Sequence, residues 1–280
     1  MAKIDELHNY AYPDKYLDEL HIYDKSIAGN TNGFDEVHNY GNRGVTYGMD
    51  ELHLYGSYQT VEVDELNTPQ DRTYEVIDID EWFDEMELDE EQKEERKELA
   101  IDIKFVLALL LLLLQADMKA GNSVDEDFYV SLGVERIMDA VNKKMPEATQ
   151  TIIAKIRAYV NTEIGLIVDS TVRNYEQPYT FSEARAVSIA VDDANALFNI
   201  KELEDAIKAG FKYKTWTTMR DNKVRHSHEI ADGQTVGIKD AFTVGRCKMT
   251  VPRVFDKETS YRDDKEVIRC RCVCNYTKKK

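Results

Sequence analysis

The sequence has no apolar run long enough to cross a membrane as a helix. Its longest, FVLALLLLLL from Phe105 to Leu114, has ten residues, about half of the roughly 20 residues that span a bilayer. The first residues, MAKIDELHNY, have no apolar core of the kind that marks a secretory signal peptide. We therefore expect no membrane association, and we expect the leucine run to be a buried helix.

Cysteine is missing from most of the chain, and so are the common catalytic patterns. The only four cysteines are Cys247, Cys270, Cys272 and Cys274, and without an export signal we expect them to be reduced thiols in a cytoplasm. The sequence has no phosphate-binding glycine loop, no G-x-S-x-G and no H-E-x-x-H. We therefore expect no enzyme activity.

Positive charge is scarce in the first part of the chain. The 280 residues carry a net charge of −17, and residues 1–100 hold 27 acidic and 8 basic side chains. Residues 208–280 hold 18 basic and 9 acidic side chains. This asymmetry predicts different partners for the two ends. The acidic end should repel nucleic acid, whereas the basic end can lie near phosphate.

Residues 1–72 contain a short repeat with the kernel apolar-Asp-Glu-(Leu/Val)-His-x-Tyr. Copies begin at Ile4, Leu17, Phe34 and Met49, and a degraded copy begins at Val63. The spacing is irregular and shorter than that of solenoid repeats, and Gly/Asn-rich connectors separate the copies. We predict a largely extended or disordered tail of short linear motifs. Tethered copies would bind a multivalent partner. The expected partner-binding residues are Asp5, Leu7, His8, Tyr10, Asp18, Leu20, His21, Tyr23, Asp35, Val37, His38, Tyr40, Asp50, Leu52, His53 and Tyr55.

Two alternatives exist for these repeats. Each kernel can instead be a short strand or a helical turn in a small repeat fold. The four histidines can also suggest metal binding, but each stands alone in its unit, without a second His or Cys at ligand spacing. We therefore do not expect a metal in the tail.

Helices should dominate the middle of the chain. Residues 73–98 predict an acidic linker that leads into a helix, with Asp89 as its N-cap. Residues 99–207 form the predicted helical region, where apolar residues recur with helical period. The expected helices cover 93–119 (ending at Gly121-Asn122), 134–144, 147–175, 182–198 and 202–210.

The pattern changes in residues 208–280. FKYKTWTTM alternates and is rich in aromatic and β-branched residues, which predicts a strand. Asp221-Asn222 and Asp232-Gly233 indicate turns. Further short strands are expected at 242–244, 248–251 and 267–276. The predicted fold class is therefore α+β: an extended or disordered repeat tail, a helical region, and a small antiparallel C-terminal domain.

This last segment also holds the only metal-like set of residues. On a strand, Cys270, Cys272 and Cys274 would share one face, with Arg271 and Val273 on the other. Together with His228 they can form a tetrahedral zinc site. However, C-x-C differs from the usual C-x₂-C spacing, and cysteines are also good small core residues. We expect no cofactor, with zinc at these four residues as the alternative.

The order of residues from Trp216 to Cys272 resembles the phage Mu protein F-like family of head morphogenesis (minor capsid) proteins of tailed bacteriophages. A Trp is followed by an Asp, an R-x-S-H, a D-G turn, a D-x-F, a Pro and a closing E-V-I-x-C-R-C. The resemblance rests on Trp216, Asp221, Arg225, His228, Asp232, Gly233, Asp240, Phe242, Pro252, Glu266, Cys270, Arg271 and Cys272.

The resemblance implies a structural role in the virion. The expected partners are the portal protein and a capsid or scaffold protein, with the basic C-terminal domain near packaged DNA and a role in packaging or ejection. The expected location is the capsid interior near the portal, and the host cytoplasm during assembly. The repeat tail and Cys274 depart from the family pattern.

Two other functions remain as alternatives. His226 and His228, beside Asp221, Glu229 and Asp232, can form the centre of a metal-dependent nuclease or a toxin-like effector. The repeats can also make the chain an adaptor that recruits a host protein.

Overall fold

The computed structural model describes residues 76–279 and the backbone of five strands that precede them. These strands are β1 (Ala2–His8), β2 (Glu19–Asp24), β3 (Asp35–Asn39), β4 (Glu51–His53) and β5 (Val61–Glu62). The chain divides into two compact units. One comprises residues 1–74, 111–125 and 171–183, and the other comprises residues 75–110, 126–170 and 184–280.

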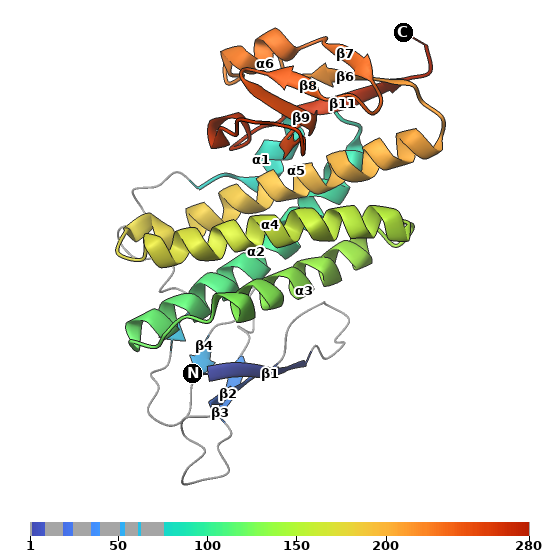
Figure 1. Ribbon diagram of the computed structural model, residues 1–280. Coiled ribbons are helices and arrows are strands. Elements are labelled where there is room, and N and C mark those ends of the chain that lie inside the picture. The colour runs from blue at the N-terminus through green and yellow to red at the C-terminus, as the bar shows by residue number, and fades with distance from the viewer. Residues whose placement is uncertain are drawn as a thin grey trace. The chain divides into compact units, whose positions relative to one another are not determined.

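Strands β1–β5 form an antiparallel sheet in which each strand pairs with the next along the chain (Figure 1). Strands β1 to β4 fall on the repeat kernels, and in the backbone register Leu7 lies opposite Leu20, which lies opposite Val37. These strands are compatible both with an extended tail and with the alternative of short paired strands. The side chains of the partner-binding residues and the segments between the strands lie outside the described residues.

Long helices make up most of residues 76–210 (Figure 1). They are α1 (Ile79–Asp84), α2 (Glu90–Lys119), α3 (Glu126–Lys144), α4 (Gln150–Arg173), the 3₁₀ turn η3 (Pro178–Phe181) and α5 (Glu183–Lys208). Within the second unit, Gly133 of α3 lies against Leu110 of α2 and Ile164 of α4. Tyr159 of α4 donates a hydrogen bond to Asp193 of α5 (3.1 Å).

The ends of α2 confirm the sequence prediction. Asp89 caps its start: Asp89 Oδ1 accepts from the Gln92 backbone N–H (2.8 Å), and Gln92 Oε1 accepts from the Asp89 N–H (3.3 Å). This reciprocal pair is a capping box. At the other end Gly121 has φ +72°, and the N–H of Asn122 donates to the carbonyl of Asp117 (2.9 Å). This 6→1 bond belongs to a Schellman motif, which ends the helix.

The leucines of this run in α2 are buried, as expected, whereas Phe105 at its start is 38 % exposed. Leu107 and all six leucines from Leu109 to Leu114 are at most 9 % exposed. By length and composition α2 is the one helix of the described residues that could cross a membrane, and 56 % of its most apolar window is buried. A core helix passes the same test, so this finding is weak evidence for a membrane span.

Two predictions about the helical region are wrong. Residues 182–198 and 202–210 were expected to form two helices, but α5 is continuous because the junction Asn199-Ile200-Lys201 contains no glycine or proline. The segment 73–98 is also more than a linker over its described residues. Asp78 caps α1, accepting from the N–H groups of Asp80 and Glu81, and Phe83 is fully buried. Burial of this side chain makes the segment part of the folded unit.

Residues 211–279 form the small antiparallel part predicted from the sequence. It contains β6 (Tyr213–Thr217), α6 (His226–Ala231), β7 (Thr235–Gly237), β8 (Phe242–Val244), β9 (Cys247–Val251), β10 (Val254–Phe255), the 3₁₀ turn η4 (Asp264–Glu266) and β11 (Val273–Thr277). Two three-stranded sheets result, with strand orders β11-β6-β7 and β10-β9-β8. Trp216 and Phe242 meet edge-to-face between them, with ring centroids 5.4 Å apart. The protein is therefore a mixed α+β fold.

Candidate functional site

His228 is the centre of a buried polar cluster. It lies in the short helix α6 and is 1 % exposed. The Trp216 ring packs edge-on against it, with centroids 5.5 Å apart. His228 Nδ1 lies 3.3 Å from Cys272 Sγ and 3.7 Å from Cys270 Sγ. One ring nitrogen therefore faces two sulfur atoms.

The other ring nitrogen of His228 faces a carboxylate. Nε2 lies 3.1 Å from Glu266 Oε2, and the same oxygen accepts a hydrogen bond from Ser227 Oγ (2.7 Å). A carboxylate at this distance favours a proton on Nε2. In that tautomer, Nδ1 presents a lone pair to the two sulfur atoms.

Cys270 and Cys272 lie in the irregular segment between η4 and β11, which corrects one prediction. All three thiols were expected on one face of a strand, but β11 begins only at Val273. Arg269 has φ +51°, a left-handed conformation that turns the chain directly before Cys270. The group of possible metal ligands among the described residues contains His228, Cys270 and Cys272, and Cys274 is outside it.

The cluster separates the pKa values of its two thiols. The hydrogen bond from Cys272 holds the pKa of Cys270 well below its usual range, against the effect of burial and with the help of His228. The same hydrogen bond, together with burial, holds the pKa of Cys272 well above its usual range. Burial lowers the pKa of His228, but its hydrogen bond to Cys270 and the nearby negative charges raise it overall. The two thiols therefore differ in acidity, and Cys270 loses its proton more readily than Cys272.

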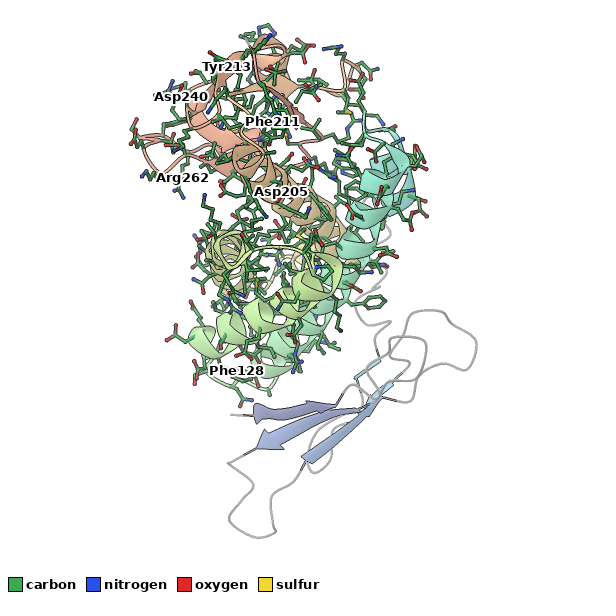
Figure 2. All side chains as sticks on the ribbon, turned by 90° about the vertical axis from the view of Figure 1, so that its right-hand side faces the viewer. Phe128, Asp205, Phe211, Tyr213, Asp240 and Arg262 are labelled. Carbon is green, nitrogen blue, oxygen red and sulfur yellow. The ribbon has the colours of Figure 1, made fainter. Side chains whose placement is uncertain are left out.

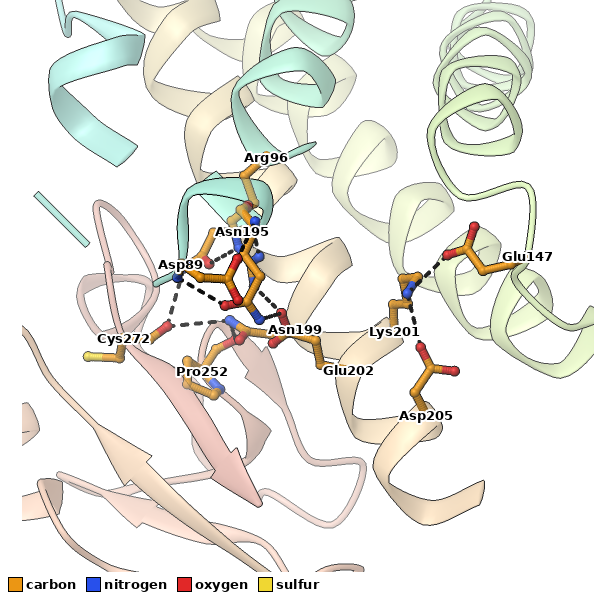
Figure 3. Close-up of polar contacts among 11 residues, drawn as sticks. Asp89, Arg96, Glu147, Asn195, Asn199, Lys201, Glu202, Asp205, Pro252 and Cys272 are labelled. Atoms are coloured by element: carbon orange, nitrogen blue, oxygen red, sulfur yellow. Dashed lines mark hydrogen bonds and ion pairs between the residues drawn. The ribbon is translucent and has the colours of Figure 1, made fainter. Parts of the chain in front are cut away.

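Two buried asparagines of α5 hold the Cys-Arg-Cys segment in place. Asn195 Nδ2 donates to the carbonyl oxygens of Cys270 (3.1 Å) and Cys272 (3.3 Å). Asn199 Nδ2 donates to the carbonyl of Cys272 (3.4 Å) and, at 3.5 Å, to that of Pro252 (Figure 3). Sequence reasoning missed both residues. In the sequence, the only indication was the spacing of four residues, which places both asparagines on the same face of a helix. In the structure, all residues from 190 to 200 of this helix are buried.

Arg96 of α2 supports Asn195 from its other side. Arg96 Nη2 pairs with Glu202 Oε1 (2.6 Å), and Arg96 Nε donates to Asn195 Oδ1 (3.4 Å) (Figure 3). The Arg96 side chain is fully buried and also lies over the Phe198 ring. Because its oxygen is engaged by Arg96, Asn195 directs its amide nitrogen at the cysteine carbonyls.

Arg271, between the two cysteines, joins two more segments. Its Nη1 lies 2.6 Å from Glu85 Oε2, and its Nη2 lies 2.6 Å from Asp221 Oδ2. Although burial opposes it, the hydrogen bond from Arg271 lowers the pKa of Asp221. Sequence reasoning singled out Asp221 and Arg271 but missed Glu85, which lies in the acidic segment before α2. Arg271 therefore binds the C-terminal part to that segment.

A further polar group supports the turn after α6. Asp232 Oδ1 accepts from the backbone N–H of Thr218 (2.9 Å), and its Oδ2 accepts from Arg220 Nε (2.9 Å). Gly233 has φ +74°, which favours glycine, and its N–H donates to the carbonyl of Trp216 (2.9 Å). The Asp-Gly pair thus fixes β6 against α6.

The remaining predicted residues fall into two groups. Arg225 donates a hydrogen bond to the carbonyl of Ile268, close to the cysteine segment. Asp240 lies apart from the cluster: its side chain is exposed at the edge of the domain, as is that of Arg262 (Figure 2).

The two histidines of the H-S-H sequence do not form one centre. The side chain of His226 is 85 % exposed and lies 3.3 Å from Glu229, whereas that of His228 is 2 % exposed. Only His228 belongs to the sulfur cluster. The arrangement therefore offers a buried set of donors rather than an exposed pair of histidines.

Comparisons with known proteins do not identify the chain. No family model matches it, and neither a curated protein nor a solved structure does.

Proposed function

We propose that this chain is a minor capsid, head morphogenesis protein of a tailed phage. One observation carries the proposal: six of the residues that resemble the Mu F-like family, namely Trp216, His228, Phe242, Glu266, Cys270 and Cys272, form one contact network, whereas Asp240 lies outside it. Trp216 packs on His228 and Phe242, and His228 contacts Cys270, Cys272 and Glu266. Residues that only happened to match a pattern would not be expected to converge in this way.

The acidic family residues are each engaged by neighbouring side chains or backbone groups. Asp221 pairs with Arg271, Asp232 binds Thr218 and Arg220, and Glu266 binds Ser227 and His228. Such a network holds a domain in one shape, which is what a structural component of a particle needs. Because Asp221, Asp232 and Glu266 are already engaged in ion pairs and hydrogen bonds, their arrangement favours a structural role over a nuclease centre.

In this proposal the parts of the chain have different partners. The helical part binds the portal protein or a second copy, and the basic C-terminal part lies near packaged DNA. The acidic repeat tail binds several copies of a capsid, scaffold or portal subunit. The location would be the capsid interior near the portal, after assembly in the host cytoplasm.

Quantitative mass spectrometry of purified particles from the cognate phage tests the proposal. We expect a few copies per portal ring. Absence from particles, with abundance in the infected cytoplasm, would contradict the proposal and favour the nuclease or adaptor alternatives. Metal-dependent cleavage of DNA that is lost in His228→Ala would indicate the former. Loss of a host partner on deletion of residues 1–72, with normal particles, would indicate the latter.

A matched pair of variants links the particle to the network. Trp216→Ala removes the ring between His228 and Phe242, whereas Asp240→Asn changes the exposed family position outside the network. We expect Trp216→Ala to reduce incorporation into particles at least tenfold and Asp240→Asn to leave it unchanged. Equal incorporation of both variants would contradict a role for the network in assembly.

A further inference from the structure

We propose that His228 Nδ1, Cys270 Sγ and Cys272 Sγ bind one zinc ion. These three donor atoms all lie within 4.8 Å of one another, and all three residues are buried. The proposed site leaves out Cys274, which lies in β11 and is outside the group. The proposal concerns the folding of the C-terminal part and is independent of the particle in which the chain serves.

The distances between the donors fit a tetrahedral ion. Zinc binds sulfur at about 2.3 Å and nitrogen at about 2.0–2.1 Å, so a tetrahedral angle places the two donors about 3.6 Å apart. The distances from His228 Nδ1 are 3.3 Å to Cys272 and 3.7 Å to Cys270. Small movements of the side chains are enough to admit the ion.

The residues around the histidine match the usual surroundings of a metal ligand. A ligating histidine nearly always donates its other ring N–H to a carboxylate, a carbonyl or water, which orients the ring. Glu266 Oε2 takes this place at 3.1 Å from Nε2 and is itself held by Ser227. Glu266 is therefore a positioning residue, and His228 keeps its Nδ1 lone pair for the ion.

Trp216 adds an independent indication. Its indole Nε1 is buried and lies beside the Cys272 thiol, and its hydrogen bond to this sulfur lowers the pKa of Cys272, against the effects of Cys270 and burial. A donor in this place stabilises a thiolate. A metal-bound thiolate, or a water molecule on the same ion, accepts such a hydrogen bond.

The donor set favours zinc over calcium and magnesium. Thiolates and imidazole suit zinc, whereas calcium and magnesium prefer oxygen ligands. The C-x-C spacing is no obstacle, because both sulfur atoms already lie within 3.7 Å of His228 Nδ1. The chain supplies three ligands, so a water molecule would take the fourth position, as in zinc sites that keep one position open.

Metal analysis of the full-length reduced protein, purified without a histidine tag, tests the proposal. We expect one zinc per chain by mass spectrometry of the elements. X-ray absorption should show two sulfur atoms at about 2.3 Å and nitrogen or oxygen at about 2.0–2.1 Å. Substitution with Co²⁺ should give the charge-transfer absorption of cobalt–thiolate bonds, which histidines of the tail cannot produce. Protein without zinc, or zinc without sulfur ligands, would overturn the proposal.

Matched cysteine variants locate the ion. Cys270→Ser and Cys272→Ser should lose the cobalt–thiolate absorption or halve it, while Cys247→Ser and Cys274→Ser should keep it. The four cysteines are all buried, so loss of a buried thiol alone is common to both pairs. An intact signal in Cys270→Ser, or its loss in Cys274→Ser alone, would rule out the proposed ligands.

If the cysteine variants do not fold, a substitution that leaves all three proposed ligands in place still tests the site. Glu266→Gln keeps the three ligands and should weaken zinc binding 10–100-fold in a chelator competition. Glu258→Gln, at an exposed carboxylate, should leave the affinity unchanged. Equal affinities in both variants would contradict the positioning role of Glu266.

Discussion

Within the second unit, the packing among the helices and the contact between α5 and the C-terminal part are stabilised by different means. Among the helices, fully buried aliphatic side chains such as Ile103, Leu107 and Ile164 form the core, and ion pairs such as Lys144–Glu98 and Lys97–Asp84 lie at the surface. Where α5 meets the C-terminal part, charged groups are themselves buried, among them Arg253, Asp192 and Asp193. A substitution in the first part should therefore have a graded effect, while one in the second should depend on the lost partner.

The largest effect is expected at Arg253. Its Nη1 lies 2.5 Å from Asp192 Oδ1 and donates to the carbonyl of Val267 (2.6 Å), and its Nη2 lies 3.7 Å from Asp193. Arg253→Met leaves two buried acids without their cation. We expect the free energy of unfolding to fall by about 3–5 kcal/mol in urea titrations. The exposed Arg262→Met, as a control, should cost about 1 kcal/mol or less.

Ile103 provides the matching test in the helices. It is fully buried in α2, so Ile103→Ala should lower the free energy of unfolding by about 2–5 kcal/mol and Ile103→Val by about 0.5–1.5 kcal/mol. Chemical denaturation of both variants measures the gradation. A valine variant as unstable as the alanine variant would show that shape, rather than buried area, controls this core.

Asp193 should make stability depend on pH. Burial raises its pKa to about 8, with a contribution from Glu163 and against the effect of Arg253. The folded state therefore binds this proton more tightly than the unfolded chain, in which the pKa is about 3.8. The resulting stabilisation is complete below about pH 4 and is lost as the pH rises to about 8.

The variant Asp193→Asn removes this dependence. Between pH 6 and pH 8 the wild type should lose about 2 kcal/mol more than the variant, because one pKa unit corresponds to about 1.4 kcal/mol. Urea unfolding at both pH values measures the difference, with the exposed Asp127→Asn as a control. Parallel curves for wild type and Asp193→Asn would show that another group carries the dependence.

The smallest effect is expected at the surface of the helices. Lys144 Nζ lies 2.6 Å from Glu98 Oε2, and the glutamate side chain is 46 % exposed. Because water and salt screen such a pair, Lys144→Gln should cost about 0.2–1 kcal/mol at low salt and less at 1 M salt. A cost above about 2 kcal/mol would mean that this exposed ion pair stabilises the fold nearly as much as a buried one, and would contradict the comparison.

The sequence predicted features that depend on nearby residues and missed features that depend on contacts between distant segments. Helical period, Asp89 and Gly121 located α2, because these signals act within a few residues of the chain. The sequence did not predict that α5 is continuous, or that Cys274 lies apart from Cys270 and Cys272. Nothing near Asn199 in sequence shows that its amide donates to the carbonyl of Cys272. Arg269 also adopts φ +51°, although arginine does not favour that conformation. Contacts between distant segments determine the place of the cysteine segment, whereas the continuity of α5 follows from a junction without glycine or proline.

The burial of cations changes what the charge of the C-terminal segment means for a nucleic acid. Lys214 is fully buried and donates to the carbonyl of Thr250, and Arg253 and Arg271 are held by acids. These three cations cannot release counterions from a phosphate backbone. If this segment binds DNA as proposed, the salt dependence of that binding should reflect only the exposed lysines and arginines, and be shallower than the 18 basic residues of this segment imply.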